Sequence, residues 1–346
     1  MFARSLARCT LPFRRTYTSE GLVYKAHGNP SEVLSLQKQV VAPPELAQVL
    51  VDFLAAPINP SDINQIQGKY PIKPPLPAIA GNEGVARVRA SGKQAGLLEG
   101  ALVVPLDAGA GTWRQSAVFD ATAVHVLPDD VPIEAAATMS INPPTALRML
   151  EEFVDLKEGD IIVQNGANSA VGQLVIQLAK AKGIHTVNVV RNRPNMSELE
   201  HYLRGLGADV VTTDEKLKAA LASADMPRPK LGLNCVGGAS STAVAKSLAP
   251  GSTIVTYGGM SMKPVTIPTS LLIFKNLTCK GFWLSGGTRG GDRESKKAVL
   301  NKLVPLLRKG QLAVRTKPLP FRQYKEAFDN QDTQSGQKTA YKTGWG

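Results

Sequence analysis

Up to about residue 130, the chain alternates short apolar runs with turn-forming residues. The run at 49–55 (VLVDFLA) is interrupted only by Asp52, and 84–88 and 101–105 are further short apolar segments. Closely spaced prolines and glycines separate these runs between residues 43 and 84. This pattern is typical of short strands joined by tight turns, and it predicts a small, irregular β-barrel or sandwich.

The pattern changes at the dipeptide Pro143-Pro144. A helix is predicted over 145–154, and apolar strands then alternate with helices. The predicted strands are 160–164, 186–190, 209–212, 231–235, 252–257 and 278–282, and the clearest helices are 169–182, 196–206 and 294–307. This alternation predicts an α/β fold with a doubly wound parallel sheet of the Rossmann type, in which right-handed crossovers place helices on both faces. After residue 315 the chain returns to strand-like character.

The composition sets limits on this α/β interpretation. With 346 residues, 43% hydrophobic and 20% charged, the chain suits two globular domains. Three cysteines exclude a disulfide scaffold and a cysteine-rich zinc site, and Cys235 and Cys279 are expected in buried strands. The four histidines are scattered and form no pair at metal-ligand spacing. The longest uncharged run, 161–179, holds several Asn and Gln side chains, so no membrane span is expected.

The N-terminus has the composition of a targeting segment. Its first 19 residues contain four arginines and no acidic residue. Arginine-rich, acid-poor, amphipathic termini are typical of mitochondrial transit peptides, and Arg8 interrupts the apolar core that a secretory signal needs. We therefore predict a transit peptide over 1–20, cleaved near Tyr17, and a location in the mitochondrial matrix. A disordered basic tail is the alternative.

The charge balance is basic. Forty Lys and Arg against 28 Asp and Glu give a formal net charge of +12, which becomes about +8 once the four N-terminal arginines are removed. Such a balance suits nucleic acid, an acidic protein partner or a phosphorylated ligand. The chain has no run of five basic residues and no segment that interleaves aromatic and basic residues, so nucleic acid is disfavoured.

A candidate phosphate-binding loop follows the strand predicted at 160–164. The loop reads GANSAVG (166–172) and leads directly into a helix. Backbone N–H groups converge at such a junction and the helix dipole favours an anion, which suits the pyrophosphate of a dinucleotide. Ser169 occupies the place of the central glycine of G-x-G-x-x-G, so an ordinary turn with a helix cap at Asn168 or Ser169 is the alternative.

The end of the next predicted strand bears on the choice of cofactor. An NAD site places an acidic residue about 20 residues after the glycine loop, where it binds the ribose 2′-hydroxyl. Here Arg191, Asn192 and Arg193 stand at that place. Guanidinium groups pair with phosphate, so the loop and the arginines together favour NADPH. Two solvated arginines are the alternative.

Three further segments carry candidate chemistry. The segments 257–260 (YGGM) and 282–284 (FWL) each follow an apolar strand, at the sheet edge where such folds bind ligands. Tyr70 lies between Gly68 and Pro71 in a polar loop, and its phenol can donate a proton or hydrogen-bond a developing oxyanion. Taken alone, these segments are also consistent with a plain turn, a core aromatic and a loop tyrosine packed on a neighbour.

Together these residues resemble the medium-chain dehydrogenase/reductase superfamily and, within it, the mitochondrial 2-enoyl thioester reductases of fatty acid synthesis. The resemblance covers the chain from residue 21 onward. It is carried by APINPSDIN (56–64), GKYP (68–71), AGNEG (80–84), INPPTA (141–146), QNGANSAVG (164–172), RNR (191–193), YGGM (257–260) and FWL (282–284). The tyrosine loop, the NSAVG form of the phosphate loop and the FWL segment narrow it to this group.

The resemblance implies NADPH-dependent reduction of a trans-2-enoyl thioester of acyl carrier protein or coenzyme A. It implies that the β-carbon receives a hydride and the α-carbon a proton, with Tyr70 as the proton donor and Trp283 lining the site. The residues that it implies for cofactor binding are Asn142, Asn168, Ser169, Ala170, Val171, Arg191, Asn192, Arg193, Tyr257, Gly258, Gly259, Met260, Phe282, Trp283, Leu284 and Lys338.

The resemblance also implies an architecture and an absence of metal. Zinc-dependent relatives carry a Gly-His-Glu segment and a cysteine in the first domain, where this chain has GNE (81–83) and NPSD (59–62). The implied fold is a GroES-like β-barrel catalytic domain over 21–142 and 313–346, with a Rossmann NADPH domain over 143–312, and the implied assembly is a homodimer. A quinone or alkenal reductase of the same superfamily, or a non-catalytic member that binds NADPH or nucleic acid, is the alternative.

Overall fold

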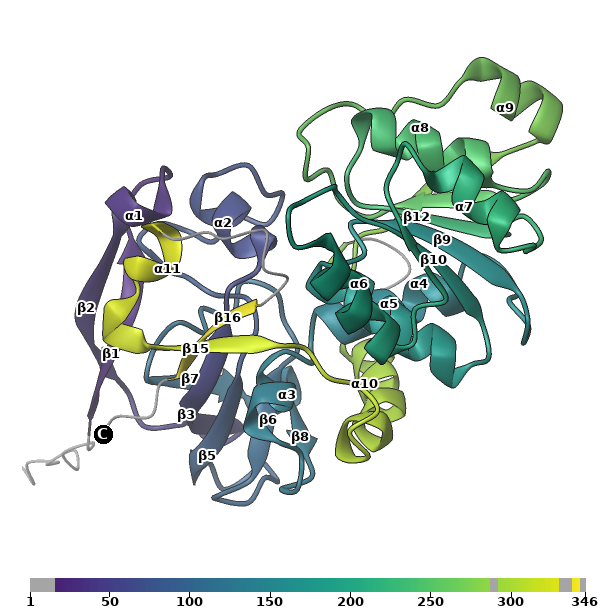
Figure 1. The fold of residues 1–346 in the computed structure, drawn as a ribbon. Helices are drawn as coiled ribbons and strands as arrows, with labels where there is room; N and C mark the ends of the chain where they lie inside the picture. Colours follow the sequence, from purple (N-terminus) through teal and green to yellow (C-terminus); the bar gives the residue numbers. More distant parts are fainter. Residues whose placement is uncertain (1–15, 287–291, 330–337, 343–346) are drawn as a thin grey trace, which may run out of the picture.

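A computed structural model describes residues 16–286, 292–329 and 338–342 of the chain. Most of the predicted targeting segment, residues 1–15, therefore lies outside the described ranges. The chain forms a β-rich part and a part built on a parallel sheet, which lie side by side (Figure 1). No described helix is both long and apolar enough to cross a membrane.

The parallel sheet has six strands in the order β11-β10-β9-β12-β13-β14. Its strands are β9 (Ile161–Asn165), β10 (His185–Val189), β11 (Val210–Thr212), β12 (Leu231–Asn234), β13 (Thr253–Thr256) and β14 (Thr278–Gly281). The chain runs outward from β9 to one edge and then returns to β12 on its other side. The carboxyl end of β9 therefore lies at the topological switch point, where open α/β sheets bind ligands. The predicted doubly wound sheet is confirmed.

Helices cover both faces of this sheet, and the strands other than the edge strand β14 are accordingly buried at nearly every position. They are α4 (Asn142–Glu151), α5 (Ala170–Ala181), α6 (Met196–Leu206), α7 (Leu217–Ser223), α8 (Gly238–Ser247), α9 (Thr269–Lys275) and α10 (Arg293–Arg308). Ile162 packs in one core cluster with residues of α4, α5 and α10. Its neighbours Ile161 and Val163 pack in another cluster with residues of α7, α8 and α9.

The β-rich part contains a seven-stranded sheet and a three-stranded sheet. Its strands are β1 (Tyr17–Tyr24), β2 (Leu34–Val41), β3 (Gln48–Pro57), β4 (Ala78–Ile79), β5 (Val85–Ser91), β6 (Leu102–Pro105), β7 (Ser116–Asp120), β8 (Val124–Leu127), β15 (Thr316–Pro320) and β16 (Lys338–Lys342). Its short helices are α1 (Pro30–Val33), α2 (Pro60–Ile66), α3 (Ile133–Ala137) and α11 (Glu326–Asp329). The C-terminal strands β15 and β16 return from the parallel-sheet part to lie beside β3 (Figure 1).

The first strand overlaps the predicted targeting segment. Strand β1 begins at Tyr17, so residues 17–20 form part of a sheet. Ser19 is buried, and its hydroxyl accepts from Ser116 N at 2.9 Å and donates to Ser116 O at 3.1 Å. Glu20 pairs with Arg322 at 2.9 Å. The bounds of the transit peptide, 1–20, stay a prediction, and cleavage near Tyr17 would leave β1 complete.

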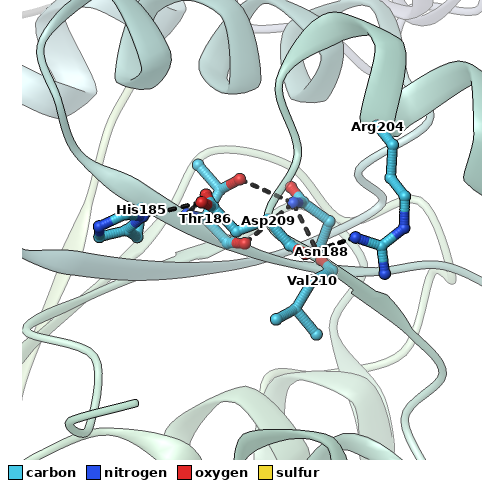
Figure 2. Close-up of polar contacts among 6 residues, drawn as sticks. All are labelled: His185, Thr186, Asn188, Arg204, Asp209 and Val210. Atoms are coloured by element: carbon cyan, nitrogen blue, oxygen red, sulfur yellow. Dashed lines mark hydrogen bonds and ion pairs between the residues drawn. The ribbon is translucent and has the colours of Figure 1, made fainter. Parts of the chain in front are cut away.

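A polar network holds the outer edge of the parallel sheet in register (Figure 2). The Asp209 carboxylate accepts from Thr186 N at 2.7 Å and contacts His185 Nδ1 at 2.8 Å. Arg204 donates to the backbone carbonyl of Asp209 at 2.8 Å. The fully buried Asn188 donates across the strand pair to Val210 O at 3.1 Å. These bonds tie β10 to β11 and hold the start of β10 in place.

Candidate functional site

The loop after β9 has the geometry of a phosphate cradle. Gly166 has φ of +61°, and a side-chain carbon there would lie 2.5 Å from the Cys235 sulfur. Ser169 caps α5, because its hydroxyl accepts from Gly172 N at 3.1 Å. A side-chain carbon on Gly172 would lie 2.6 Å from Ala167 O, so the helix start needs glycine to pack against the loop. The free N–H groups of the first turn of a helix suit an anion.

Buried side-chain amides of β9 and β10 hold the phosphate loop in place through hydrogen bonds. Gln164, which is fully buried at the end of β9, donates to Gly172 O at 2.9 Å and to Asn188 Oδ1 at 2.8 Å. The start of α5 is thereby linked to β10. Asn168, Ala170 and Val171 lie in the loop and the first helical turn, where each is partly exposed. The four residues expected at the phosphates are therefore brought together around one helix terminus.

The arginine turn lies next to this loop. Ala167 N donates to Val189 O at 3.2 Å, which joins the loop to the end of β10. Arg191 and Asn192 follow and are exposed, while Arg193 is partly buried and donates to Arg191 O at 3.4 Å. A dinucleotide with its pyrophosphate at α5 would direct its ribose toward the end of β10. The exposed Arg191 guanidinium is available there for a 2′-phosphate.

The segment 257–260 lies beside the phosphate loop, because the buried Tyr257 hydroxyl is close to Ser169. The Tyr257 hydroxyl is enclosed beside the Cys235 thiol, and burial holds the pKa of Tyr257 well above its ordinary value. Burial also raises the pKa of the Cys235 thiol. Around Gly259 no atom would obstruct an added side-chain carbon, so the backbone there is open to a ligand. The Met260 side chain, in the same segment, is 58% exposed.

The structure brings Tyr70 and Trp283 together although 213 residues separate them. Trp283 Nε1 donates to the Tyr70 hydroxyl at 2.7 Å, and the two rings meet edge to face with centroids 5.9 Å apart. Tyr70 is held at the end of α2, where its backbone N–H donates to Asn64 O at 3.1 Å. Trp283 follows β14 of the parallel sheet. The predicted proton donor and site-lining residue therefore meet where the two parts of the molecule join.

The neighbours of Trp283 have other contacts. The Phe282 ring packs edge to face on Phe153 at 5.9 Å, within the core that α4 shares with the sheet. Its side chain therefore supports the core, and only its backbone can serve the expected cofactor contact. Leu284 lines a cavity of about 20 Å³ together with Leu106 and Leu300. That volume holds about one water-sized group.

Asn142 and Lys338 are the remaining residues expected at the cofactor. Asn142 is 7% exposed at the start of α4, and its amide donates to Asn59 Oδ1 at 3.4 Å. Its side chain is thus engaged within the protein, beside the segments that carry Tyr70. Lys338 belongs to β16, but its side chain lies outside the described part of the structure. Its predicted cofactor contact stays a prediction.

A buried hydrogen-bond network joins the segments 59–62 and 82–83, which the resemblance matches to the metal-ligand segments of zinc-dependent proteins. Asp62 and Glu83 are both fully buried. Asn82 donates to Asp62 Oδ1 at 2.6 Å, and Asn59 donates to Glu83 Oε1 at 2.8 Å. These residues do not fit zinc, because they include no Cys or His and their carboxylates accept protein hydrogen bonds. Nor do three His, Cys, Asp or Glu side chains gather as metal ligands elsewhere in the described part of the chain.

Sequence reasoning used this polar cluster only to exclude metal and assigned it no role. The available signal was the density of Asn, Asp and Glu in 59–62 and 82–83, within otherwise apolar surroundings. Buried polar groups of this kind must find partners inside the protein. The pattern therefore predicts a network, but it does not say which side chains pair.

The chain is similar to known reductases over nearly its whole length. Residues 45–129 match the alcohol dehydrogenase GroES-like domain, and residues 170–304 match the zinc-binding dehydrogenase family. The human mitochondrial enoyl-[acyl-carrier-protein] reductase is 48% identical over 313 residues, which are 89% of this chain and 84% of the human protein. The Arabidopsis thaliana protein of the same name is 43% identical over 90% of this chain and 84% of its own length.

Solved structures agree with this sequence similarity. The complex of Etr1p with NADP and crotonyl-CoA has a TM-score of 0.86 and 34% sequence identity, and the match covers 94% of this chain and 100% of that one. The predicted combination of a GroES-like domain and a Rossmann-type domain is confirmed. The chain belongs to the mitochondrial enoyl-[acyl-carrier-protein] reductases of the medium-chain dehydrogenase/reductase superfamily.

Proposed function

We propose that the protein reduces trans-2-enoyl thioesters to saturated acyl thioesters with NADPH, in mitochondrial fatty acid synthesis. The observation that carries this proposal is the hydrogen bond from Trp283 Nε1 to the Tyr70 hydroxyl, at the join between the sheet with the phosphate loop and the β-rich part. Relatives named as enoyl reductases, and a structural neighbour that holds NADP and crotonyl-CoA, support the same reaction.

The direction of this hydrogen bond leaves the phenol proton of Tyr70 available. An indole N–H can only donate, so Tyr70 accepts with its oxygen and directs its own O–H elsewhere. We infer that this O–H faces the substrate and delivers the proton to the α-carbon. The Trp283 N–H then stabilises the negative charge that remains on the phenol oxygen. Trp283 thus orients the proton donor and supports it after the transfer.

The residues around the switch point fit NADPH, which supplies the hydride when bound. We assign the pyrophosphate to the helix terminus formed by Asn168, Ser169, Ala170 and Val171, and the 2′-phosphate to Arg191 and its turn. The open backbone at Gly259 fits the close approach of a ribose or nicotinamide. In the same proposal, residues 143–312 form the cofactor domain, and residues 21–142 with 313–346 form the catalytic domain.

The test follows NADPH absorbance with crotonyl-CoA, on protein that begins at Thr16. NADH and a quinone are the parallel arms. We expect rapid turnover with NADPH and crotonyl-CoA, and much slower turnover with NADH. Turnover of the quinone alone would overturn the proposed substrate while keeping the cofactor.

We further propose that the carrier-linked substrate docks at the tyrosine loop. Lys69 and Lys73 flank Tyr70 and are exposed, and within the described residues neither has a carboxylate at ion-pair distance. An acidic carrier protein would meet these two charges as its acyl group enters. We expect Lys69→Glu with Lys73→Glu to raise the KM of crotonyl-carrier protein by about tenfold at low salt.

Neutral crotonyl-pantetheine separates docking from chemistry, because it lacks both the acidic carrier and the phosphates of coenzyme A. Its KM should be unchanged in the double variant. Lys216→Glu with Lys218→Glu, at the exposed start of α7, is the matched control, because it changes the net charge by the same four units. An equal effect of the two double variants on the carrier substrate would contradict docking at Lys69 and Lys73.

We propose a homodimer formed through strand β14, the edge of the parallel sheet opposite to β11. Within the described residues, β14 pairs only with β13, and all four of its residues are exposed, including Cys279, which sequence analysis expected to be buried. In the adjacent α9, Phe274 is 82% and Ile273 65% exposed. A bare edge strand beside an apolar helix suits pairing with a second copy about a two-fold axis.

Charges in this surface should separate the two copies. We expect Ile273→Glu with Phe274→Glu to convert the dimer to a monomer in sedimentation equilibrium, because carboxylates cannot be buried unpaired. Leu98→Glu, at an equally exposed leucine in the β-rich part, is the control and should leave the mass unchanged. A wild-type mass of one chain would contradict the dimer.

We propose processing ahead of Tyr17 and a location in the mitochondrial matrix. A cut there removes the four N-terminal arginines and leaves β1 complete. A cut after Glu20 would remove Ser19, whose hydroxyl makes two hydrogen bonds to Ser116. The names of the relatives support the mitochondrial location.

A further inference from the structure

The buried carboxylate of Glu83 lies between two segments that carry proposed site residues. It is 0% exposed. Its Oε1 accepts from Asn59 Nδ2 at 2.8 Å, and its Oε2 accepts from Ile141 N at 3.0 Å and Ser140 Oγ at 3.3 Å. A fully buried carboxylate costs several kcal/mol unless such donors compensate it. The cost of burying this carboxylate indicates that Glu83 has a role beyond packing.

One arm of this network reaches Tyr70. Asn59 is the N-cap of α2, where its backbone N–H donates to Asp62 Oδ2 at 2.7 Å. At the other end of the same seven-residue helix, Asn64 O accepts from the backbone N–H of Tyr70. The position of the Tyr70 backbone therefore follows the position of α2, and Glu83 holds the cap of that helix.

The other arm reaches Asn142 and the parallel-sheet part. Glu83 accepts from the backbone N–H of Ile141, the residue that caps α4. Asn142 is the first residue of α4, and its side chain returns to Asn59 at 3.4 Å. Since α4 packs with α5 and α10 on one face of the sheet, this arm ties Glu83 to the cofactor side of the molecule.

We propose that Glu83 is a positioning residue for the reduction, and this rests on the function proposed above. Through Asn59 and Ile141 it holds α2, to which the backbone of Tyr70 is hydrogen-bonded, in fixed geometry against the helix that begins at Asn142. Proton delivery to the α-carbon depends on that geometry, whereas cofactor binding at the α5 terminus does not. Glu83 thus acts through Tyr70 and does not touch the reacting atoms.

The charge and symmetry of the carboxylate explain why glutamate stands here. Both of its oxygens accept, and the groups around them are N–H and O–H donors. Glutamine has nearly the same shape but presents one NH2 group. That group would face either Asn59 Nδ2 or Ile141 N, so a donor would meet a donor and one arm would be lost.

The test is Glu83→Gln, measured with crotonyl-CoA and NADPH. We expect kcat to fall at least about tenfold, because small misplacements of a catalytic group are costly, while the Kd of NADPH measured by fluorescence stays unchanged. In a Tyr70→Phe background, Glu83→Gln should have little further effect on kcat, because its effect passes through the phenol. A purely structural role would give the same loss in both backgrounds.

A second variant keeps the proposal falsifiable if Glu83→Gln folds poorly. Asn59→Ser retains a good N-cap for α2 but loses the amide that reaches Glu83, so it should show a comparable loss of kcat in a protein that folds with a lowered melting temperature and binds NADPH with unchanged Kd. Glu151→Gln, on the surface of α4, controls for loss of a carboxylate and should leave kcat unchanged. Full activity of folded Glu83→Gln and Asn59→Ser would overturn the positioning role. Inactivity of the wild type would instead overturn the proposed function.

Discussion

Tyr70→Phe is expected to lower kcat for crotonyl-CoA reduction by about 10²- to 10⁴-fold, the range that a positioned proton donor contributes. The change removes the phenol proton and also the acceptor of the Trp283 N–H bond. It leaves the ring in place, so the edge-to-face contact with Trp283 at 5.9 Å is retained. The measurement is steady-state NADPH oxidation, with NADPH binding measured separately by fluorescence.

The control for Tyr70→Phe is Tyr17→Phe, which removes a phenol hydroxyl on β1 while Arg89 remains over the ring. It should keep full activity. NADPH binding should be the same in both variants and the wild type. Unchanged turnover in Tyr70→Phe would remove Tyr70 from its role as proton donor. A matched loss of NADPH binding would instead point to a disturbed cofactor site.

Replacing Arg191 and Arg193 together by alanine is expected to raise the KM of NADPH by about 10²-fold or more. Hydrogen bonds to a charged group contribute about 1.5–3 kcal/mol each, and two guanidiniums are removed from the turn that follows β10. The KM of NADH should change little, because NADH has no 2′-phosphate. The ratio of kcat/KM for the two cofactors therefore measures this contribution directly.

The matched control is Arg228→Ala, an exposed arginine far along the chain from the turn. It should leave the preference for NADPH intact. Because Arg191 is exposed, the preference of the wild type should also weaken as salt is raised. Equal losses for NADPH and NADH in the double variant would mean that the turn supports the fold of the site and does not bind the 2′-phosphate.

The parallel-sheet part could be predicted from local pattern. Helix α6 (Met196–Leu206) has the predicted bounds and ends at Gly207, whose φ of +112° a side chain rarely adopts. The strands were predicted within one or two residues, because each has a short core of apolar or β-branched residues between turn or helix segments. The two N-terminal strands β1 and β2 were not located, since β1 begins with polar residues and β2 is mostly polar or partly exposed, so neither has a long apolar run.

The candidate site could be predicted in its parts but not in its contacts. The phosphate loop and the arginine turn are continuous segments whose chemistry is local, so their residue types were informative. Tyr70 and Trp283 lie 213 residues apart, and no local pattern pairs them. The cofactor contacts expected of Phe282 and Tyr257 stay predictions, and no local pattern shows that the Phe282 ring packs on Phe153 or that the Tyr257 hydroxyl is enclosed beside Cys235.

The sequence by itself determined the elements of the parallel sheet, the phosphate loop and the absence of Cys and His at the zinc positions. These properties depend on neighbours in the chain: apolar periodicity, turn residues and the donor atoms that a side chain carries. The tertiary structure alone decided that Tyr70 accepts from Trp283, that Glu83 joins α2 to α4, and that Cys279 lies on an exposed edge. Those contacts arise when distant segments pack, and close packing, not local propensity, selects which side chains meet.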